Sequence, residues 1–168
     1  MSCGSVGGSR SNGCVCEVVR AILDIQNEAT NDCVGCTTNC FMEPLGGIVS
    51  PARTAANTRV FTLSTKDGTP FFATFTSSDY PNVCISTYFR VEDVFDDCCA
   101  TLRVLVPLDE PTGMDGDPVC LVSDDGRGID ICKLCKVEGF ALSDSCITVD
   151  LSCFCAVQCI ADVELDVC

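Results

Sequence analysis

Seventeen cysteines dominate the chemistry that is available to this chain of 168 residues. Thiols can bind a soft metal ion, exchange disulfides, pack as small apolar side chains or cross-link polypeptides. The densest group lies in the segment SCITVDLSCFCAVQCI, where four cysteines fall within the fourteen residues from Cys146 to Cys159. The spacing of the cysteines, and the strands or loops that carry them, must decide among these four kinds of chemistry.

Two CxxC pairs, Cys33 with Cys36 and Cys132 with Cys135, have the spacing of half-sites in a four-thiolate zinc centre. The pairs lie far apart in the sequence, and thirteen other cysteines make chance pairs frequent. A thioredoxin-like redox centre also uses CxxC, but it needs a βαβ context that the sequence lacks. A zinc-binding adaptor and a thiol-disulfide oxidoreductase therefore stay open as alternatives to cross-linking, and we assign no cofactor, metal ligand or catalytic residue.

Charge and composition exclude several classes of protein. The net charge is −14 with only three lysines, which argues against nucleic-acid binding, because affinity for phosphate backbones comes mainly from clustered lysine and arginine. Histidine is absent, which removes the commonest general base and every zinc site that uses imidazole. No stretch approaches the roughly 18 to 20 apolar residues of a membrane-spanning helix, so we expect no membrane insertion.

The frequency of cysteine, about a tenth of the chain, is typical of disulfide scaffolds in oxidising compartments. The start, MSCGSVGGSRSNGCVC, has neither the basic beginning nor the apolar core of a signal peptide. We therefore expect synthesis in the cytoplasm without a signal peptide, followed by function in an oxidising place. Because the number of cysteines is odd, at least one thiol has no partner within the chain.

The hydrophobic pattern predicts one domain that is mainly β. Residues 1–13 are rich in Gly and Ser and should form a flexible arm, and residues 14–168 should form a single cysteine-rich domain. Within that domain we expect an amphipathic helix at about 14–27, a loop at about 33–57 and a β region at about 58–168. The predicted fold is a single compact antiparallel β-sandwich or barrel-like domain, preceded by the N-terminal helix.

Two further patterns locate strands. Asp67-Gly68, between two β-branched runs, predicts a β-hairpin, and weaker strands are expected at residues 119–123 and 128–134. Every odd position from 147 to 167 is apolar or cysteine, which predicts one buried face. That run is too long for one strand of three to ten residues, so we expect a bend or bulge near residues 153–158.

Alternation along these strands divides the cysteines into two groups. Cys98, Cys153, Cys155 and Cys159 share the inward parity, and we expect them to be buried or bonded within the chain. Cys84, Cys99 and Cys146 have the outward parity, and other cysteines lie in loops, near the ends or at the start of the helix. The candidates for intermolecular disulfides are therefore Cys3, Cys14, Cys16, Cys33, Cys36, Cys40, Cys84, Cys99, Cys146 and Cys168.

Four segments carry a resemblance to a known family: CVCEVVRAILDIQ, ANTRVFTLSTKDGTPFFATF, YFRVEDVFDDCCATLRVL and CITVDLSCFCAVQCIADV. Together they resemble the cysteine-rich spore coat and exosporium family that includes CotY, CotZ and ExsY. The resemblance covers residues 14–163, although residues 42–56 and 107–118 match less well.

This resemblance implies a structural protein, not an enzyme, made in the mother cell of a spore-forming bacterium and placed on the outer coat, crust or exosporium of the spore. It also implies self-assembly into hexagonal sheets that disulfides harden. Such a sheet would act as a semi-permeable barrier and hold other cysteine-rich coat proteins and surface filament proteins. The implied partners are thus copies of the chain itself and other proteins of the spore surface.

Overall fold

The computed structural model describes residues 14–29, 56–77, 80–95 and 97–167. Its elements are α1 (Cys14–Ala29), β1 (Thr58–Thr65), β2 (Ala73–Ser77), β3 (Tyr80–Ser86), β4 (Phe89–Val94), β5 (Cys99–Leu108), α2 (Ile131–Leu134), β6 (Gly139–Asp150), the 3₁₀ turn η1 (Leu151–Cys153) and β7 (Phe154–Val163). The expected class, mainly antiparallel β with an N-terminal helix, is confirmed. None of the helices in these ranges is long and apolar enough to cross a membrane.

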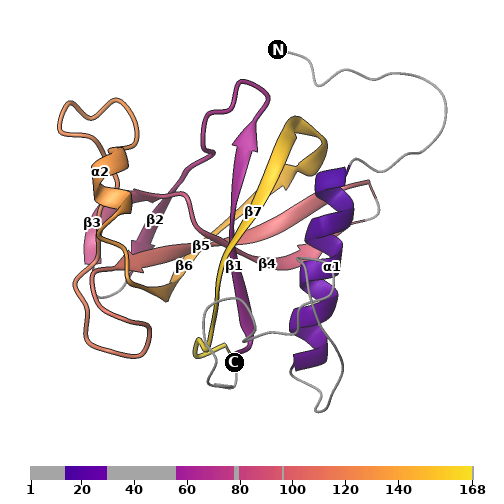
Figure 1. The fold of residues 1–168 in the computed structure, drawn as a ribbon, viewed down its shortest axis with the longest axis horizontal. Helices are drawn as coiled ribbons and strands as arrows, with labels where there is room; N and C mark the ends of the chain where they lie inside the picture. Colours follow the sequence, from indigo (N-terminus) through magenta and orange to yellow (C-terminus); the bar gives the residue numbers. More distant parts are fainter. Residues whose placement is uncertain (1–13, 30–55, 78–79, 96, 168) are drawn as a thin grey trace.

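Five strands form the main sheet in the order β6-β5-β4-β1-β7, and all its pairings are antiparallel. β2 and β3 form a second, two-stranded sheet, and β2 contacts β5 and β6 of the main sheet. Figure 1 shows α1 against one end of this assembly and α2 near the other. The main sheet is open, with β6 and β7 at its edges, so the expected sandwich describes the fold better than a closed barrel.

The open sheet is nevertheless strongly curved. η1 joins β6 directly to β7, although these strands lie at opposite edges of the sheet. The step from Asp150 to Phe154 can span at most about 14 Å, whereas the edges of a flat five-stranded sheet lie roughly 19 Å apart. The sheet must therefore curl until its two edges approach each other at η1.

Helix α1 covers part of the main sheet with an apolar side. Val15, Val19 and Ile22 recur at helical spacing, are buried, and belong to one core cluster with Phe61 and Phe89 of the sheet. The helix ends at Ala29, two residues later than expected. Periodicity located the helix correctly because burial on the sheet reinforces the same pattern that favours the helix.

Gln26 connects the end of this helix to two neighbouring strands. Its side-chain amide donates a hydrogen bond to the Val91 carbonyl at 3.0 Å, and its side-chain oxygen accepts one from the Arg59 backbone N–H at 3.1 Å. Only 2% of Gln26 is exposed, so the amide bridges β1 and β4 inside the protein. A buried amide with both ends bonded fixes the position of the helix, because leaving either strand group unpaired would be unfavourable.

The turn at Asp67-Gly68 forms as expected, with φ of 82° at Gly68. Asp67 accepts hydrogen bonds from the Thr65 hydroxyl and the Thr69 N–H, and the bond from Thr65 does most to lower the pKa of the Asp67 carboxyl. The expected hairpin, however, does not continue into paired strands. Pro70 makes only an isolated bridge, and β2 leaves β1 to pair with β3, because proline cannot donate to a ladder.

The expected strands at residues 119–123 and 128–134 are wrong. They make one isolated bridge, Val122 with Ile129, and the second segment ends in α2. The Asp130 side chain accepts a hydrogen bond from the Cys132 N–H at 2.9 Å, which caps the start of that helical turn. This local cap overrides the weak alternation in the sequence.

The long alternating run at the C-terminal end divides into β6 and β7, and the expected irregularity lies between them. After η1, Thr65 pairs with Phe154 whereas Ser64 pairs with Ala156, so Cys155 is the extra residue of a β-bulge. The prediction of a bend or bulge near residues 153–158 is confirmed. Its effect is that the side-chain parity of the run changes at Cys155.

Gly139, at the first residue of β6, touches another loop closely. A Cβ atom at this position would lie 2.2 Å from the Glu110 carbonyl oxygen and 2.4 Å from the Thr112 nitrogen. We expect Gly139→Ala to lower the free energy of unfolding by about 2 to 3 kcal/mol, because backbone atoms must move to admit the methyl group. Thermal unfolding measures the effect; the matched control is Gly128→Ala, where no atom lies within 4 Å, and equal melting of both variants would contradict the prediction.

Candidate cross-linking cysteines

The first disulfide, Cys16–Cys98, fastens α1 to the main sheet. The two Cα atoms lie 5.6 Å apart across a sequence separation of 82 residues. Cys16 is fully buried and Cys98 is 7% exposed, so a neighbouring molecule cannot reach this pair. The expectation that Cys16 forms an intermolecular disulfide is therefore corrected, because Cys16 lies on the side of α1 that faces the sheet.

Cys98 and Cys99 point to different surroundings at the start of β5. Cys98 lies in the turn between β4 and β5 with φ of 62°, a left-handed conformation that is uncommon for a residue with a side chain. Its carbonyl accepts a hydrogen bond from the Leu151 N–H at 2.9 Å, which joins this turn to η1. Cys99 is half-exposed and carries a free thiol.

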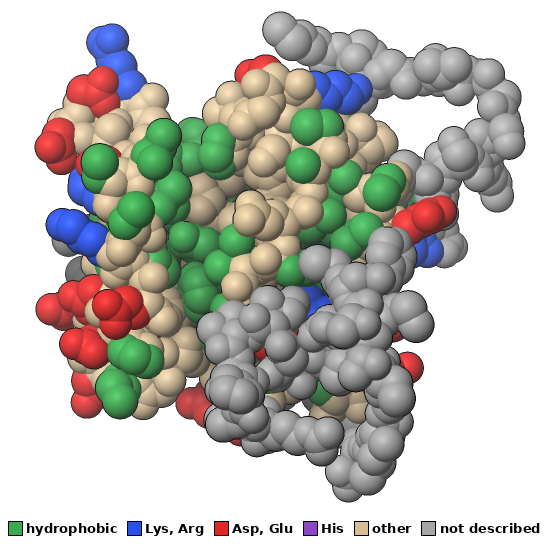
Figure 2. All heavy atoms as spheres, in the orientation of Figure 1, with side chains coloured by type: hydrophobic (Ala, Val, Ile, Leu, Met, Phe, Trp, Pro, Cys, Tyr) green, Lys and Arg blue, Asp and Glu red, His purple; other side chains and the backbone are tan. Residues whose placement is uncertain are grey.

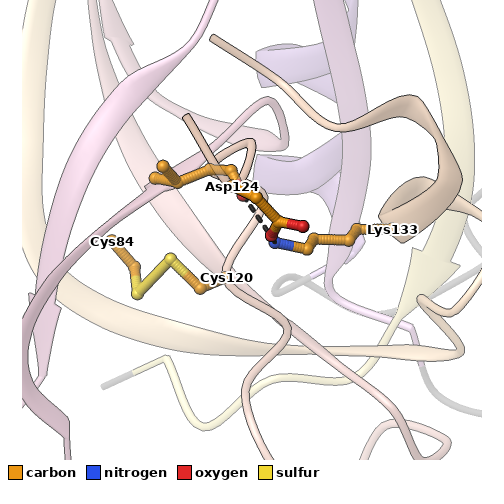
Figure 3. Close-up of a disulfide and its surroundings, with 5 residues drawn as sticks. Cys84, Cys120, Asp124 and Lys133 are labelled. Carbon is orange, nitrogen blue, oxygen red and sulfur yellow. Dashed lines mark hydrogen bonds and ion pairs between the residues drawn. A yellow bond between two sulfur atoms is a disulfide. The ribbon is translucent and has the colours of Figure 1, made fainter. Parts of the chain in front are cut away.

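The second disulfide, Cys84–Cys120, joins β3 to the segment that precedes α2 (Figure 3). Its Cα atoms lie 5.4 Å apart, and the sequence separation is 36 residues. The expectation that Cys84 faces outward for an intermolecular disulfide is corrected. The end of β3 is covered on both faces: Cys84 packs against one core cluster and Ile85 belongs to another, so alternation does not distinguish inside from outside here.

The last three cysteines of the inward group have different environments. Cys153, in η1, is disulfide-bonded within the chain, and Cys159, in β7, is half-buried against the main core cluster. Cys155 is exposed, and its thiol lies 3.0 Å from the Thr65 carbonyl oxygen. The expectation that Cys155 is buried or bonded within the chain is therefore corrected, because the bulge turns this residue outward.

Cys146 is an exposed free thiol on β6, directly opposite Arg103 of β5. The Arg103 guanidinium donates to Glu92 at 2.6 Å and to the Ser143 carbonyl at 3.2 Å. The hydrogen bond to Glu92 is the main cause that raises the pKa of Arg103, and the charges of Glu92, Cys146 and Asp144 act in the same direction. A fixed cation thus lies beside the Cys146 thiol.

Sequence reasoning gave no role in cross-linking to Cys120, Cys132 or Cys135. The structure bonds Cys120 within the chain and places the other two as exposed free thiols at α2. Burial raises the pKa of the nearby Tyr88 hydroxyl, and the negative charge of Cys135 adds to that effect. In the sequence, Cys132 and Cys135 lie between turn segments rich in acidic residues and glycine. That composition favours an exposed loop over a strand and could have identified both as exposed thiols.

Five candidates lie outside the described residues: Cys3, Cys33, Cys36, Cys40 and Cys168, together with the expected arm at residues 1–13 and most of the expected loop at 33–57. The proposed zinc pairing of the two CxxC motifs includes Cys33 and Cys36 and so depends on that part of the chain. Within the described ranges, no group of three or more Cys, Asp or Glu side chains is arranged to hold a metal ion. In the same ranges α2 has only four residues, unlike the helix that carries a thioredoxin-type CxxC.

Comparison with known proteins identifies the family of the chain. A family model described as spore coat protein Z matches residues 1–162. The spore coat protein Z of Bacillus subtilis (strain 168) is 32% identical over 157 residues, which cover 90% of this chain and 90% of that protein. No solved structure matches the chain. The chain belongs to the spore coat protein Z family.

Proposed function

We propose that this chain is a structural, non-enzymatic protein of the bacterial spore surface that assembles with copies of itself into a disulfide-cross-linked, two-dimensional hexagonal lattice. Membership of the spore coat protein Z family supports the structural role and the location on the spore. In this proposal the lattice lies in the outer coat, crust or exosporium and acts as a semi-permeable layer. It also holds other cysteine-rich coat proteins and surface filament proteins.

The separation of the cysteines into two kinds carries the proposal. Within the described residues, the disulfides Cys16–Cys98 and Cys84–Cys120 join buried or half-buried parts of the fold, and Cys153 is also disulfide-bonded. Five free thiols in the same part of the chain are exposed instead: Cys14, Cys132, Cys135, Cys146 and Cys155. A fold that needs only some of its cysteines for internal bonds retains exposed thiols that can bond neighbouring molecules once the surroundings become oxidising.

We infer that non-covalent contacts determine the geometry of the lattice and that disulfides form afterwards as locks. Lattices need at least two interfaces, one that closes a ring and one that joins rings. The exposed free thiols of the described residues occur on α1, β6 and β7 and at α2, so more than one contact can be locked. Such bonds would make disassembly require both separation and reduction.

Electron microscopy of the purified chain, paired with reducing and non-reducing gels, tests the proposal. We expect ordered sheets in air and a ladder of covalent multimers that collapses to monomer on reduction. Zinc content measured on protein purified without chelators, and reduction of insulin disulfides, address the adaptor and the oxidoreductase. A chain that stays monomeric in air, without sheets or ladders, would rule out the proposed assembly.

A further inference from the structure

The segment Ile131–Lys136, here called the α2 tip, combines an exposed apolar side chain with two thiols. Ile131 is 74% exposed, the largest fraction among the exposed large hydrophobic residues of the described chain. Cys132 and Cys135 are exposed free thiols on the same short helical turn. A single exposed hydrophobic residue is common on protein surfaces, so a contact here depends on the polar groups that surround it.

Those polar groups are lysines, which are rare in this chain. Lys133 and Lys136 are two of only three lysines in a chain with a net charge of −14. The Lys133 ammonium donates to the Val122 carbonyl at 2.6 Å and lies 3.4 Å from Asp124, as Figure 3 shows. Lys136 is exposed and follows Cys135 directly. A thiol and a cation therefore lie side by side at the α2 tip.

The α2 tip is held firmly on the fold beneath it. The Asp130 N–H donates to the Leu121 carbonyl at 2.9 Å, and Leu121 is fully buried. The residue before Leu121 is Cys120, whose disulfide to Cys84 fixes the same segment to β3. This support presents the α2 tip as a fixed surface, so that little conformational entropy is lost on contact.

The opposite end of the molecule carries an acidic surface. Cys14, Glu17, Asp24 and Glu28 are all exposed on α1, and their spacing of three, seven and four residues places them along one side of the helix. This set is the α1 acidic side. It lies away from the residues of α1 that pack on the sheet, and Cys14 and Glu17 are neighbours one turn apart.

Building on the proposed function, we infer that the α2 tip of one copy docks on the α1 acidic side of the next copy, and that Cys14 there bonds to Cys132 or Cys135. Two observations favour a second copy as the occupant: Lys136 is an exposed cation that can pair with the α1 acidic side, whereas Lys133 is already paired with Asp124, and each surface has an exposed thiol beside its charge. Figure 1 places α1 and α2 at opposite ends of the longest axis, and Figure 2 shows basic, acidic and apolar side chains together at the α2 end.

This contact joins different surfaces, so it repeats from copy to copy. A head-to-tail interface closes into a ring if its rotation allows, and otherwise it extends as a filament. Because the two surfaces lie at opposite ends of the molecule, the α2 tip of one copy cannot reach the α1 acidic side of the same copy. If its rotation closes, the contact supplies the ring-forming interface that a hexagonal lattice requires.

The covalent step is a two-electron oxidation. The S–H bonds of Cys14 and of one α2 thiol break and one S–S bond forms between the two copies. The two electrons and two protons pass to molecular oxygen, which becomes hydrogen peroxide. The α2 tip carries two thiols and the α1 acidic side carries one. One α2 thiol therefore remains reduced at each contact.

Isotope mixing tests the contact directly in the full chain. Unlabelled and ¹⁵N-labelled reduced proteins are mixed, oxidised in air and digested with trypsin without reduction. Cleavage after lysine and arginine gives residues 11–20, which contain Cys14 and stay bonded to residues 91–103 through Cys16–Cys98, and separates them from residues 128–133 and 134–136, which contain Cys132 and Cys135. We expect disulfide-linked peptides that join 11–20 to 128–133 or 134–136 with one labelled and one unlabelled half. Cys14→Ser should abolish them, and Cys146→Ser, which removes another exposed thiol, should not.

A charge exchange tests the docking independently of sulfur. Glu17→Lys alone and Lys136→Glu alone should each reduce the yield of the mixed peptide at least threefold, and the two variants mixed together should restore it. If sheets and covalent ladders form but the mixed-isotope peptide is absent, this contact is refuted while the proposed function stands. If neither sheets nor ladders form, both are refuted.

Discussion

Replacing Asp162 with asparagine is expected to lower the free energy of unfolding by about 3 to 5 kcal/mol, because it leaves the positive charge of Arg59 buried without its carboxylate. The Arg59 Nε and Nη2 atoms donate to the two carboxylate oxygens of Asp162, each at 2.8 Å. Neither side chain is exposed to solvent. The two residues are direct partners across β1 and β7, so the ion pair holds an edge strand to the sheet.

Urea denaturation followed by circular dichroism, at a protein concentration too low for assembly, measures this effect. The matched control is Glu164→Gln, which neutralises an exposed carboxylate two residues further along the same segment and should change stability by less than about 0.5 kcal/mol. The double variant Arg59→Met with Asp162→Leu should recover most of the loss, because it removes both buried charges. Equal stability of Asp162→Asn and Glu164→Gln would show that the buried pair does not hold β7.

The sequence predicted those features that depend on local periodicity. Helix α1 was located by its apolar spacing, and the length of the alternating C-terminal run correctly predicted an irregularity near residues 153–158. The same reasoning failed at Cys155, where a single bulge reverses the parity, and at Cys84, where β3 is covered on both faces. In each case a contact with another strand or segment decided which way the side chain faces. The alternation within a single strand does not reveal such contacts.

For a related reason, the sequence did not predict which residues far apart in the chain form ion pairs or disulfides. In the sequence, Arg59 and Asp162 each look like ordinary surface residues of alternating strands. The two residues are 103 positions apart, so nothing local indicates that they pair. The bond between Cys16 and Cys98 joins a helix to a turn 82 residues later, and a single sequence cannot tell which of seventeen cysteines meet. By contrast, the odd number of cysteines alone established that at least one thiol has no partner within the chain.

Removing the Cys16–Cys98 disulfide should lower the stability almost as much as breaking the buried ion pair. We expect the double variant Cys16→Ala with Cys98→Ala to lose about 3 to 4 kcal/mol, because the bond closes a long loop in the unfolded chain. For a domain of this size the loss corresponds to a melting temperature lower by roughly 6 to 16 °C. The helix that the bond fastens would also separate more easily from the sheet.

That separation gives the prediction a second readout. The side of α1 with Val15, Val19 and Ile22 packs on Phe61 and Phe89, so detachment would expose apolar surface on both partners. Binding of the dye ANS should therefore increase in the double variant below its melting temperature. Cys14→Ala is the matched control: it removes an exposed thiol from the same helix, two residues before Cys16, and should leave both melting and dye binding unchanged. A double variant that melts with the control would mean that packing and the Gln26 bridge hold α1 without the disulfide, because those contacts remain when the sulfur atoms are removed.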